Sequence, residues 1–91
     1  GRKTAREKIA SLLAILARRE AILNPELEEV ASLRFDLPIT REAMADYLGL
    51  TIETVSRAFG KLKREGVIDI FSAHTVEILD KAALEALALA D

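Results

Sequence analysis

Hydrophobic residues recur at intervals of three and four along the first part of the chain, which places them on one face of an α-helix. The stripe consists of Ile9, Leu12, Leu13 and Leu16. Alanines with high helix propensity lie between these residues. Thr4 and Glu7 have the spacing of a capping box, in which each side chain satisfies a backbone donor at the start of a helix. The pattern therefore predicts a helix over residues 5–21.

Shorter patterns follow the first helix. Pro25 suits the first position of a helical turn, so residues 26–31 are expected to form a short acidic turn. Apolar and charged residues then alternate over residues 33–37, which predicts a short strand.

Two helices separated by a tight turn are predicted next, over residues 40–65. Thr40 and Thr51 are candidate N-caps, and Gly49 and Gly66 are placed to end the two helices. The first helix has an apolar stripe that is expected to be core: Ala43, Met44, Tyr47 and Leu48. Two helices joined in this way form a helix-turn-helix unit.

The hydrophobic period changes after Gly66. Two β-branched, apolar runs predict a hairpin over residues 67–79, with Ser72-Ala73-His74 at its tip. Asp80 is then placed to cap a terminal helix over residues 81–90. A hairpin directly after a helix-turn-helix unit predicts a mainly α fold with a small β-hairpin, the winged helix-turn-helix, as a single domain over residues 1–91.

The helix expected at residues 52–65 has two contrasting faces. Its core stripe is Ile52, Val55, Phe59 and Leu62. The opposite face is polar: Glu53, Arg57, Gly60, Lys61 and Arg64, with Ser56 on the flank. Arginine offers a planar fork that matches guanine, glutamate can accept from cytosine, and serine can contact a base edge or a thymine methyl group. Lysine and arginine further along suit phosphates. The simpler interpretation, an exposed ion pair between Glu53 and Arg57, is worth only about 0.2–0.5 kcal/mol and is compatible with base reading.

The charge distribution is more informative than its total. The net charge of −2 over 91 residues argues weakly against nucleic acid as a partner. However, residues 1–19 carry +5 and residues 54–66 carry +3, whereas residues 20–53 carry −6 and residues 67–91 carry −4. A protein that binds a polyanion needs a basic face rather than a basic total. On charge alone, ordinary solvated helix faces explain the two basic segments equally well.

Several classes of protein are disfavoured by composition. The chain has no cysteine and one histidine, His74, so disulfides are excluded and neither a metal site nor a cofactor is expected in this domain. No apolar run approaches the ~20 residues that span a bilayer, and no signal peptide is recognisable. His74 is the single candidate base for the serines, so the sequence does not predict an enzyme.

The helix-turn-helix segment resembles that of Crp/Fnr-family transcription regulators, and most closely the Fnr/FixK-like branch. The residues that carry the resemblance run from Ile39 to Arg57 and include Gly49-Leu50-Thr51-Ile52-Glu53-Thr54-Val55-Ser56-Arg57. The resemblance continues through Lys61-Leu62 and Gly66-Val67-Ile68 into the hairpin. It covers residues 5–90.

This resemblance implies sequence-specific binding of double-stranded DNA, with base reading by Glu53, Ser56 and Arg57. The Crp branch has a further base-reading arginine where this chain has Ile52, a departure that favours a TTGA-type half-site. Phosphate contacts are expected from polar residues at the starts of the two helices, along the second helix and at the hairpin tip: Thr40, Arg41, Thr51, Thr54, Lys61, Arg64, Ser72 and His74.

The resemblance also implies partners and a longer protein. Family members carry an N-terminal sensor domain and a dimerisation helix, neither of which is present in these residues, so the chain is expected to be a C-terminal piece that is monomeric or weakly dimeric. The longer protein is expected to act as a homodimer in the bacterial cytoplasm, to activate transcription and to contact RNA polymerase. The alternative from a different class is a winged-helix protein-interaction module that reads no bases and uses the acidic surfaces.

Overall fold

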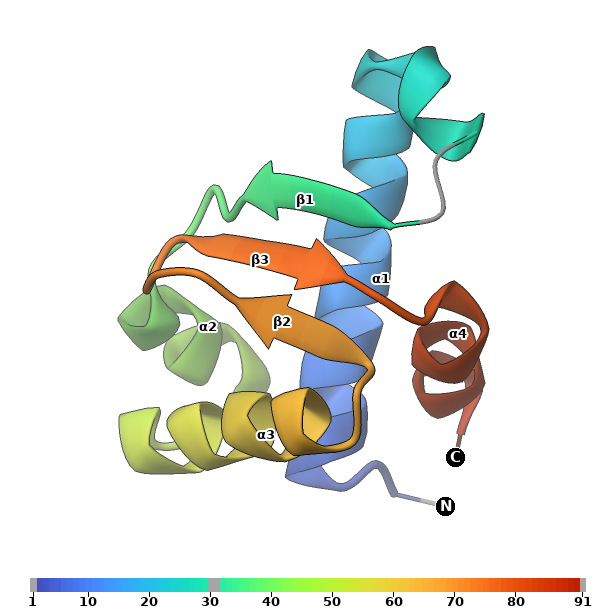
Figure 1. Ribbon diagram of the computed structural model, residues 1–91. Helices are drawn as coiled ribbons and strands as arrows, with labels where there is room; N and C mark the ends of the chain where they lie inside the picture. Colours follow the sequence, from blue (N-terminus) through green and yellow to red (C-terminus); the bar gives the residue numbers. More distant parts are fainter. Residues whose placement is uncertain (1, 30–31, 91) are drawn as a thin grey trace.

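The computed structural model describes residues 2–29 and 32–90. In this part of the chain, helices cover a small antiparallel sheet (Figure 1). The helical elements are α1 (Ala5–Leu23), the 3-10 helix η1 (Pro25–Glu29), α2 (Arg41–Leu48), α3 (Ile52–Arg64) and α4 (Lys81–Leu89). The strands are β1 (Leu33–Asp36), β2 (Ile68–Ile70) and β3 (Thr75–Ile78). The predicted winged helix-turn-helix is therefore confirmed.

The sheet is larger than the predicted hairpin. β3 is its central strand and pairs antiparallel with both β2 and β1, in the order β1-β3-β2. Leu33 and Phe35 of β1 lie opposite Ile78 and Val76 of β3. The sequence predicted a strand here but gave it no partner, because pairing between segments about forty residues apart leaves no local signal.

Each α-helix begins at the residue predicted to cap it. The N-caps are Thr4, Thr40, Thr51 and Asp80, and each side chain accepts a hydrogen bond from a backbone N–H in the first turn. Thr4 and Glu7 form the complete capping box. α1 ends later than expected, at Leu23, since Ile22 and Leu23 continue the helix and Asn24 caps it by donating to the Glu20 carbonyl. The segment expected to form an acidic turn over residues 26–31 is a 3-10 helix that ends at Glu29, and residues 30–31 lie outside the described part.

Gly49 makes the short connection between α2 and α3. Its φ of 69° is left-handed, a conformation that costs a residue with a side chain roughly 1–2 kcal/mol. The N–H of Leu50 then donates to the Ala45 carbonyl at 2.9 Å, which closes the end of α2. This turn fixes the direction in which α3 leaves α2.

A single hydrophobic core joins α1, α3 and the sheet. Ile9 and Leu13 of α1 are fully buried, as are Val55, Phe59 and Leu62 of α3. The inward residues of β2 and β3 complete the core: Ile68, Val76 and Ile78. Burial of this stripe turns the opposite face of α3 toward solvent.

Three residues expected in the core lie at the surface. Tyr47 is 74% exposed, Ile52 is 44% exposed and Ala43 is also exposed. α2 packs mainly against α3, and among its described residues Met44 and Ala45 are the ones that are buried. Ile52 belongs to the first turn of α3, beyond the edge of the core.

Candidate nucleic-acid interface

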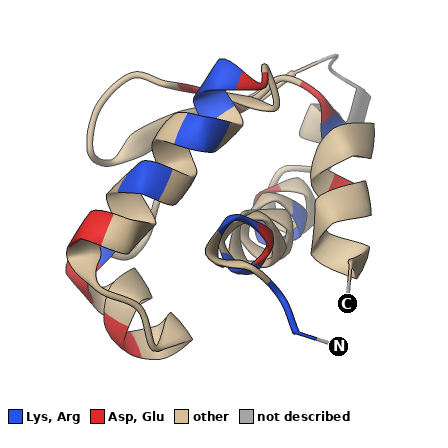
Figure 2. Cartoon of the chain, turned by 90° about the horizontal axis from the view of Figure 1, so that it is seen from below, with Lys and Arg blue, Asp and Glu red and all other residues tan. Residues whose placement is uncertain are grey.

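The three predicted base-reading residues lie together on the first two turns of α3. All three are exposed, with Glu53 and Arg57 on the side of the helix opposite Val55 and Phe59 and Ser56 on its flank. In Figure 2 a glutamate position near the start of α3 is followed by successive lysine and arginine positions along the helix. The N-terminal part of a recognition helix is the part that contacts base edges, so the geometry matches that use.

Arg57 does not pair with Glu53, contrary to the expected ion pair. Its Nη2 donates instead to Thr54 Oγ1 at 3.4 Å. Among the described residues Glu53 takes part in no ion pair, so both the carboxylate and the guanidinium face solvent. The sequence could not show whether Arg57 bonds to Thr54 or to Glu53, because residues three and four positions away are both neighbours on a helix.

The second half of α3 is basic. Lys61 and Arg64 are exposed, and neither forms an ion pair within the described ranges. Lys63 Nζ lies 3.9 Å from Asp69 Oδ1 of β2, so this lysine is paired within the protein. A Cβ atom on Gly60 would lie 3.4 Å from Arg64 Nη1, so the side chain of Arg64 runs back along the helix over this glycine.

Arg41 lies between the two helices of the helix-turn-helix unit. Its guanidinium carbon is 4.3 Å from the centre of the Phe59 ring, a cation–π contact, and its Nε is buried without a hydrogen-bond partner. Burial lowers the pKa of Arg41 from its usual value, yet a shift of this kind leaves an arginine charged at neutral pH. Arg41 therefore packs on the core as well as carrying a charge near the start of α2.

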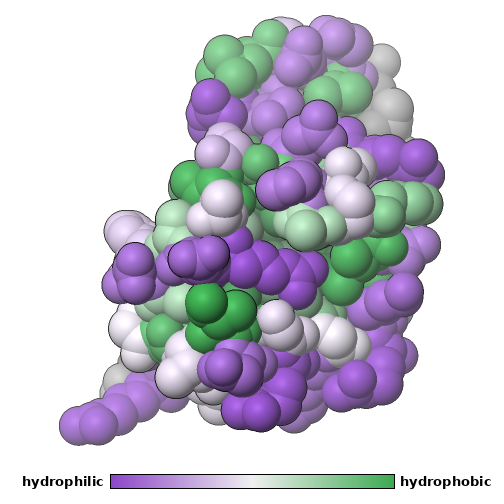
Figure 3. Space-filling model, turned by 90° about the vertical axis from the view of Figure 1, so that its left-hand side faces the viewer, coloured by the Kyte–Doolittle hydropathy of each residue, from purple (hydrophilic) through white to green (hydrophobic). Residues whose placement is uncertain are grey.

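The tip of the wing is held by its own side chains. Ser72 Oγ accepts from the backbone N–H groups of His74 and Thr75, both at 3.1 Å. Ser72 and His74 are exposed, as the sequence predicted for a tip that could meet a phosphate. On the face that carries α2, the wing turn and the start of α3, hydrophobic surface forms separate patches among hydrophilic ones (Figure 3).

Most of the described basic residues in the first basic segment, residues 1–19, have partners within the protein. Arg6 pairs with Glu65, Arg18 with Glu85 and Arg19 with Glu20. Lys3 Nζ donates to the carbonyls of Ala88 and Ala90, at 2.6 and 2.5 Å, and Lys8 Nζ donates to the Leu48 carbonyl at 3.3 Å. Several cations of the first basic segment are thus paired within the protein, whereas Lys61 and Arg64 on α3 are exposed and form no ion pair within the described residues.

A cluster on the outer face of the sheet was not predicted. Arg34 lies over the Phe71 ring at 3.7 Å and donates to Glu77 Oε1. Hydrogen bonds from Ser32 and then Arg34 lower the pKa of Glu77. The cluster depends on the pairing of β1 with β3, which has no local signature in the sequence.

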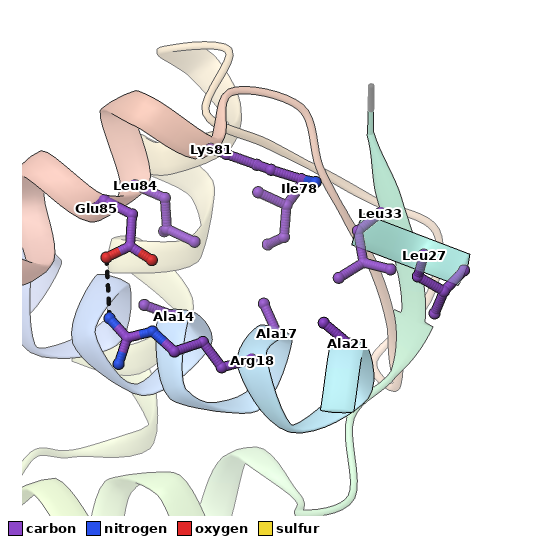
Figure 4. Close-up of a pocket in the computed structure, with 10 residues that line it drawn as sticks. All are labelled: Ala14, Ala17, Arg18, Ala21, Leu27, Leu33, Ile78, Lys81, Leu84 and Glu85. Atoms are coloured by element: carbon purple, nitrogen blue, oxygen red, sulfur yellow. Dashed lines mark hydrogen bonds and ion pairs between the residues drawn. The ribbon is translucent and has the colours of Figure 1, made fainter. Parts of the chain in front are cut away.

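An apolar pocket of about 310 Å³ lies away from α3 (Figure 4). α1, η1, β1, β3 and α4 line it, and no residue of α2 or α3 takes part. The ion pair between Arg18 and Glu85, with a separation of 3.0 Å, crosses its rim. The pocket therefore belongs to the helix packing and not to the polar face of α3.

Within residues 2–29 and 32–90, no three histidine, cysteine or acidic residues gather as metal ligands would. None of the described helices combines the length and apolar character needed to cross a membrane.

Comparison with known proteins gives consistent matches. Residues 7–87 match the family model described as the Crp-like helix-turn-helix domain. The chain is 61% identical over 84 residues to the transcriptional activator protein FnrL of Cereibacter sphaeroides, covering 92% of this chain and 34% of FnrL. It is 49% identical over 90 residues to the nitrogen fixation regulation protein FixK of Bradyrhizobium diazoefficiens, covering 99% of this chain and 35% of FixK.

The fold is also found in a solved structure. The structure of FixK2 from Bradyrhizobium japonicum superposes with a TM-score of 0.76 at 35% identity, over 100% of this chain and 41% of the FixK2 chain. The chain spans about a third of the length of the curated relatives it matches.

Proposed function

Because this chain belongs to the Crp-like helix-turn-helix family of DNA-binding domains, we propose that α3 reads a TTGA-type half-site in the major groove of double-stranded DNA. The main support for the proposal is the exposed group of Glu53, Ser56 and Arg57 on a helix whose Val55, Phe59 and Leu62 are fully buried. Ile52 in place of a further arginine favours the TTGA type.

Each of the three side chains has a suitable partner on a base pair. The Arg57 fork matches O6 and N7 of the guanine in the half-site. Glu53 can accept from the amino group of a cytosine, and Ser56 can contact a thymine methyl group. Because Glu53 and Arg57 are not paired with each other, no ion pair between them has to be broken before these contacts form.

The phosphate contacts that we propose surround this group. They come from the start of α2, the start and end of α3 and the wing tip: Thr40, Arg41, Thr51, Thr54, Lys61, Arg64, Ser72 and His74. Lys61 and Arg64 support this assignment most strongly, since they are exposed and form no ion pair within the described residues. Such contacts fix the position of a protein on the duplex without reading sequence.

Lys61→Ala should weaken binding to every duplex by the same factor. Removal of one phosphate contact lowers the slope of log K against log salt by about 0.9 and leaves the ratio between TTGA and scrambled duplexes unchanged. Fluorescence anisotropy over a salt series measures both quantities. Arg18→Ala is the matched control, because Arg18 pairs with Glu85 away from α3. If Lys61→Ala altered the ratio, or if Arg18→Ala altered the slope equally, the phosphate assignment would be wrong.

We also propose partners for the longer protein. Two copies would bind a two-fold site whose half-sites lie about one helical turn, ~34 Å, apart, and the pair would activate transcription in the bacterial cytoplasm through contact with RNA polymerase. The present chain alone would be monomeric or weakly associated, which sedimentation velocity tests.

A second candidate function is a protein-interaction module. It is favoured by apolar side chains exposed away from α3: Ile15, Ile22, Leu23 and Tyr47. Such a module has no use for the polar group on α3 and would bind TTGA and scrambled duplexes equally. An activator would combine both functions, so these exposed residues do not weigh against DNA binding.

A further inference from the structure

A chain of hydrogen bonds runs along α3 from its cap to the side chain of Arg57. Thr51 Oγ1 accepts from the backbone N–H of Thr54 at 3.1 Å and donates to Thr54 Oγ1 at 2.9 Å. Thr54 Oγ1 also accepts from Arg57 Nη2 at 3.4 Å. The arginine side chain is thereby joined, through two hydroxyl groups, to the residue that fixes the start of the helix.

Thr54 is well suited to hold another side chain. Its side chain is half-buried, whereas Glu53 and Arg57 are exposed. As a β-branched residue it has few side-chain rotamers in a helix, and its hydroxyl oxygen has two acceptor sites. Both sites are used, by Thr51 and by Arg57, so the proton of the Thr54 hydroxyl remains available to a phosphate.

The Arg57 guanidinium has an alternative partner on the same helix. Glu53 lies one turn before Arg57 on the same face, at the spacing of an attractive i,i+4 ion pair. In the structure Arg57 is bonded to Thr54 instead. Without the Thr54 hydroxyl, the guanidinium would be expected to turn toward Glu53, and this ion pair would then have to break before either group could contact a base.

We infer that Thr54 is a positioning residue for base reading: it holds the Arg57 guanidinium away from Glu53, so that both groups are ready for their bases. The inference rests on the base-reading role of Arg57 proposed above. Thr54 acts here through Arg57 and not on a base. Groups held in their bound arrangement bind more tightly because less freedom is lost on binding.

Thr54→Val tests this role, because valine keeps the shape and branching of threonine but lacks the hydroxyl. We expect the ratio of affinities for a TTGA duplex and a duplex with its G·C pair replaced by A·T to fall about threefold, the effect of one modest hydrogen bond. Thr54→Ser, which keeps the hydroxyl, should restore the ratio. In an Arg57→Ala background, Thr54→Val should change the ratio no further.

The same measurements separate the ways in which the inference can fail. A Thr54 that only contacts phosphate would weaken both duplexes alike, and an unchanged ratio in Thr54→Val would overturn the positioning role. If Arg57→Ala itself left the ratio unchanged, the proposed base reading and the inference would both be wrong. If Arg57→Ala lowered the ratio of affinities and Thr54→Val did not, base reading by Arg57 would stand and the inference about Thr54 alone would fail.

A measurement on the free protein gives a second readout. In NMR spectra the rotation of the Arg57 guanidinium about its Nε–Cζ bond should be slower in the unaltered protein and in Thr54→Ser than in Thr54→Val. Equal rotation in all three would contradict the inference independently of DNA binding.

Discussion

Phe59→Ala should lower the free energy of unfolding by about 3–5 kcal/mol, the usual cost of removing a large aromatic side chain from a core. Phe59 is fully buried in the middle of the apolar stripe of α3. The substitution leaves a cavity beneath the helix and removes the ring on which Arg41 lies at 4.3 Å. Small domains are stable by only about 5–15 kcal/mol, so a large part of the total would be lost. Urea unfolding followed by circular dichroism measures the change.

Ile52→Ala is the matched control for Phe59→Ala, since both positions belong to the apolar stripe predicted for α3. Ile52 is 44% exposed, so its truncation should cost much less. Similar losses in the two variants would contradict the placement of Ile52 at the edge of the core and of Phe59 in its centre.

Arg57→Ala should weaken binding to a TTGA duplex by about 1–3 kcal/mol and relax the preference at the guanine position. The substitution removes the planar fork that matches guanine, and Arg57 is exposed, so the fold should be unaffected. Titration of the protein into duplexes that differ at single base pairs gives the loss at each position. Arg57→Lys is the matched control: it keeps the charge but not the fork, so it should retain non-specific affinity and still lose preference at guanine.

Lys61→Ala is expected to behave differently from Arg57→Ala: it should weaken binding to all duplexes and leave the preference for the TTGA duplex unchanged. If Arg57→Ala produced that pattern too, Arg57 would be a phosphate contact and not a base-reading residue.

Local features of this fold could be predicted from the sequence. The four helix starts are set by Thr4, Thr40, Thr51 and Asp80, whose side chains bond within their own first turn. Gly49 likewise acts on the residues directly around it. Signals of this kind depend on short spacings, and they were sufficient for the order and the type of the helices.

Features that depend on distant segments could not be predicted. β1 joins the sheet by pairing with β3, and no residue within β1 identifies that partner. Tyr47 has the spacing of a core residue, yet it is 74% exposed, because α2 packs mainly against α3 and the described residues leave most of Tyr47 uncovered. Hydrophobic spacing identifies a face of a helix, but the neighbours that cover the face come from the whole fold.

In the candidate site, too, some features could be predicted from the sequence and others could not. The polar face of α3 follows from helical geometry, so the exposure of Glu53, Ser56 and Arg57 was predictable. The choice of Thr54 over Glu53 as the partner of Arg57 was not, because both positions are within reach on a helix. The stacking of Arg41 on Phe59 was not predictable either, since it depends on how α2 crosses α3.

Base reading by α3 is tested most directly by the affinity of this chain for a TTGA duplex, compared with a scrambled duplex of equal composition across a salt series. We expect at least about tenfold tighter binding to the TTGA duplex at each salt concentration, because each lost base contact costs about 1–3 kcal/mol. Both affinities should fall in parallel as salt rises, since the phosphate contacts are shared. Equal affinity for the two duplexes would contradict base reading by Glu53, Ser56 and Arg57.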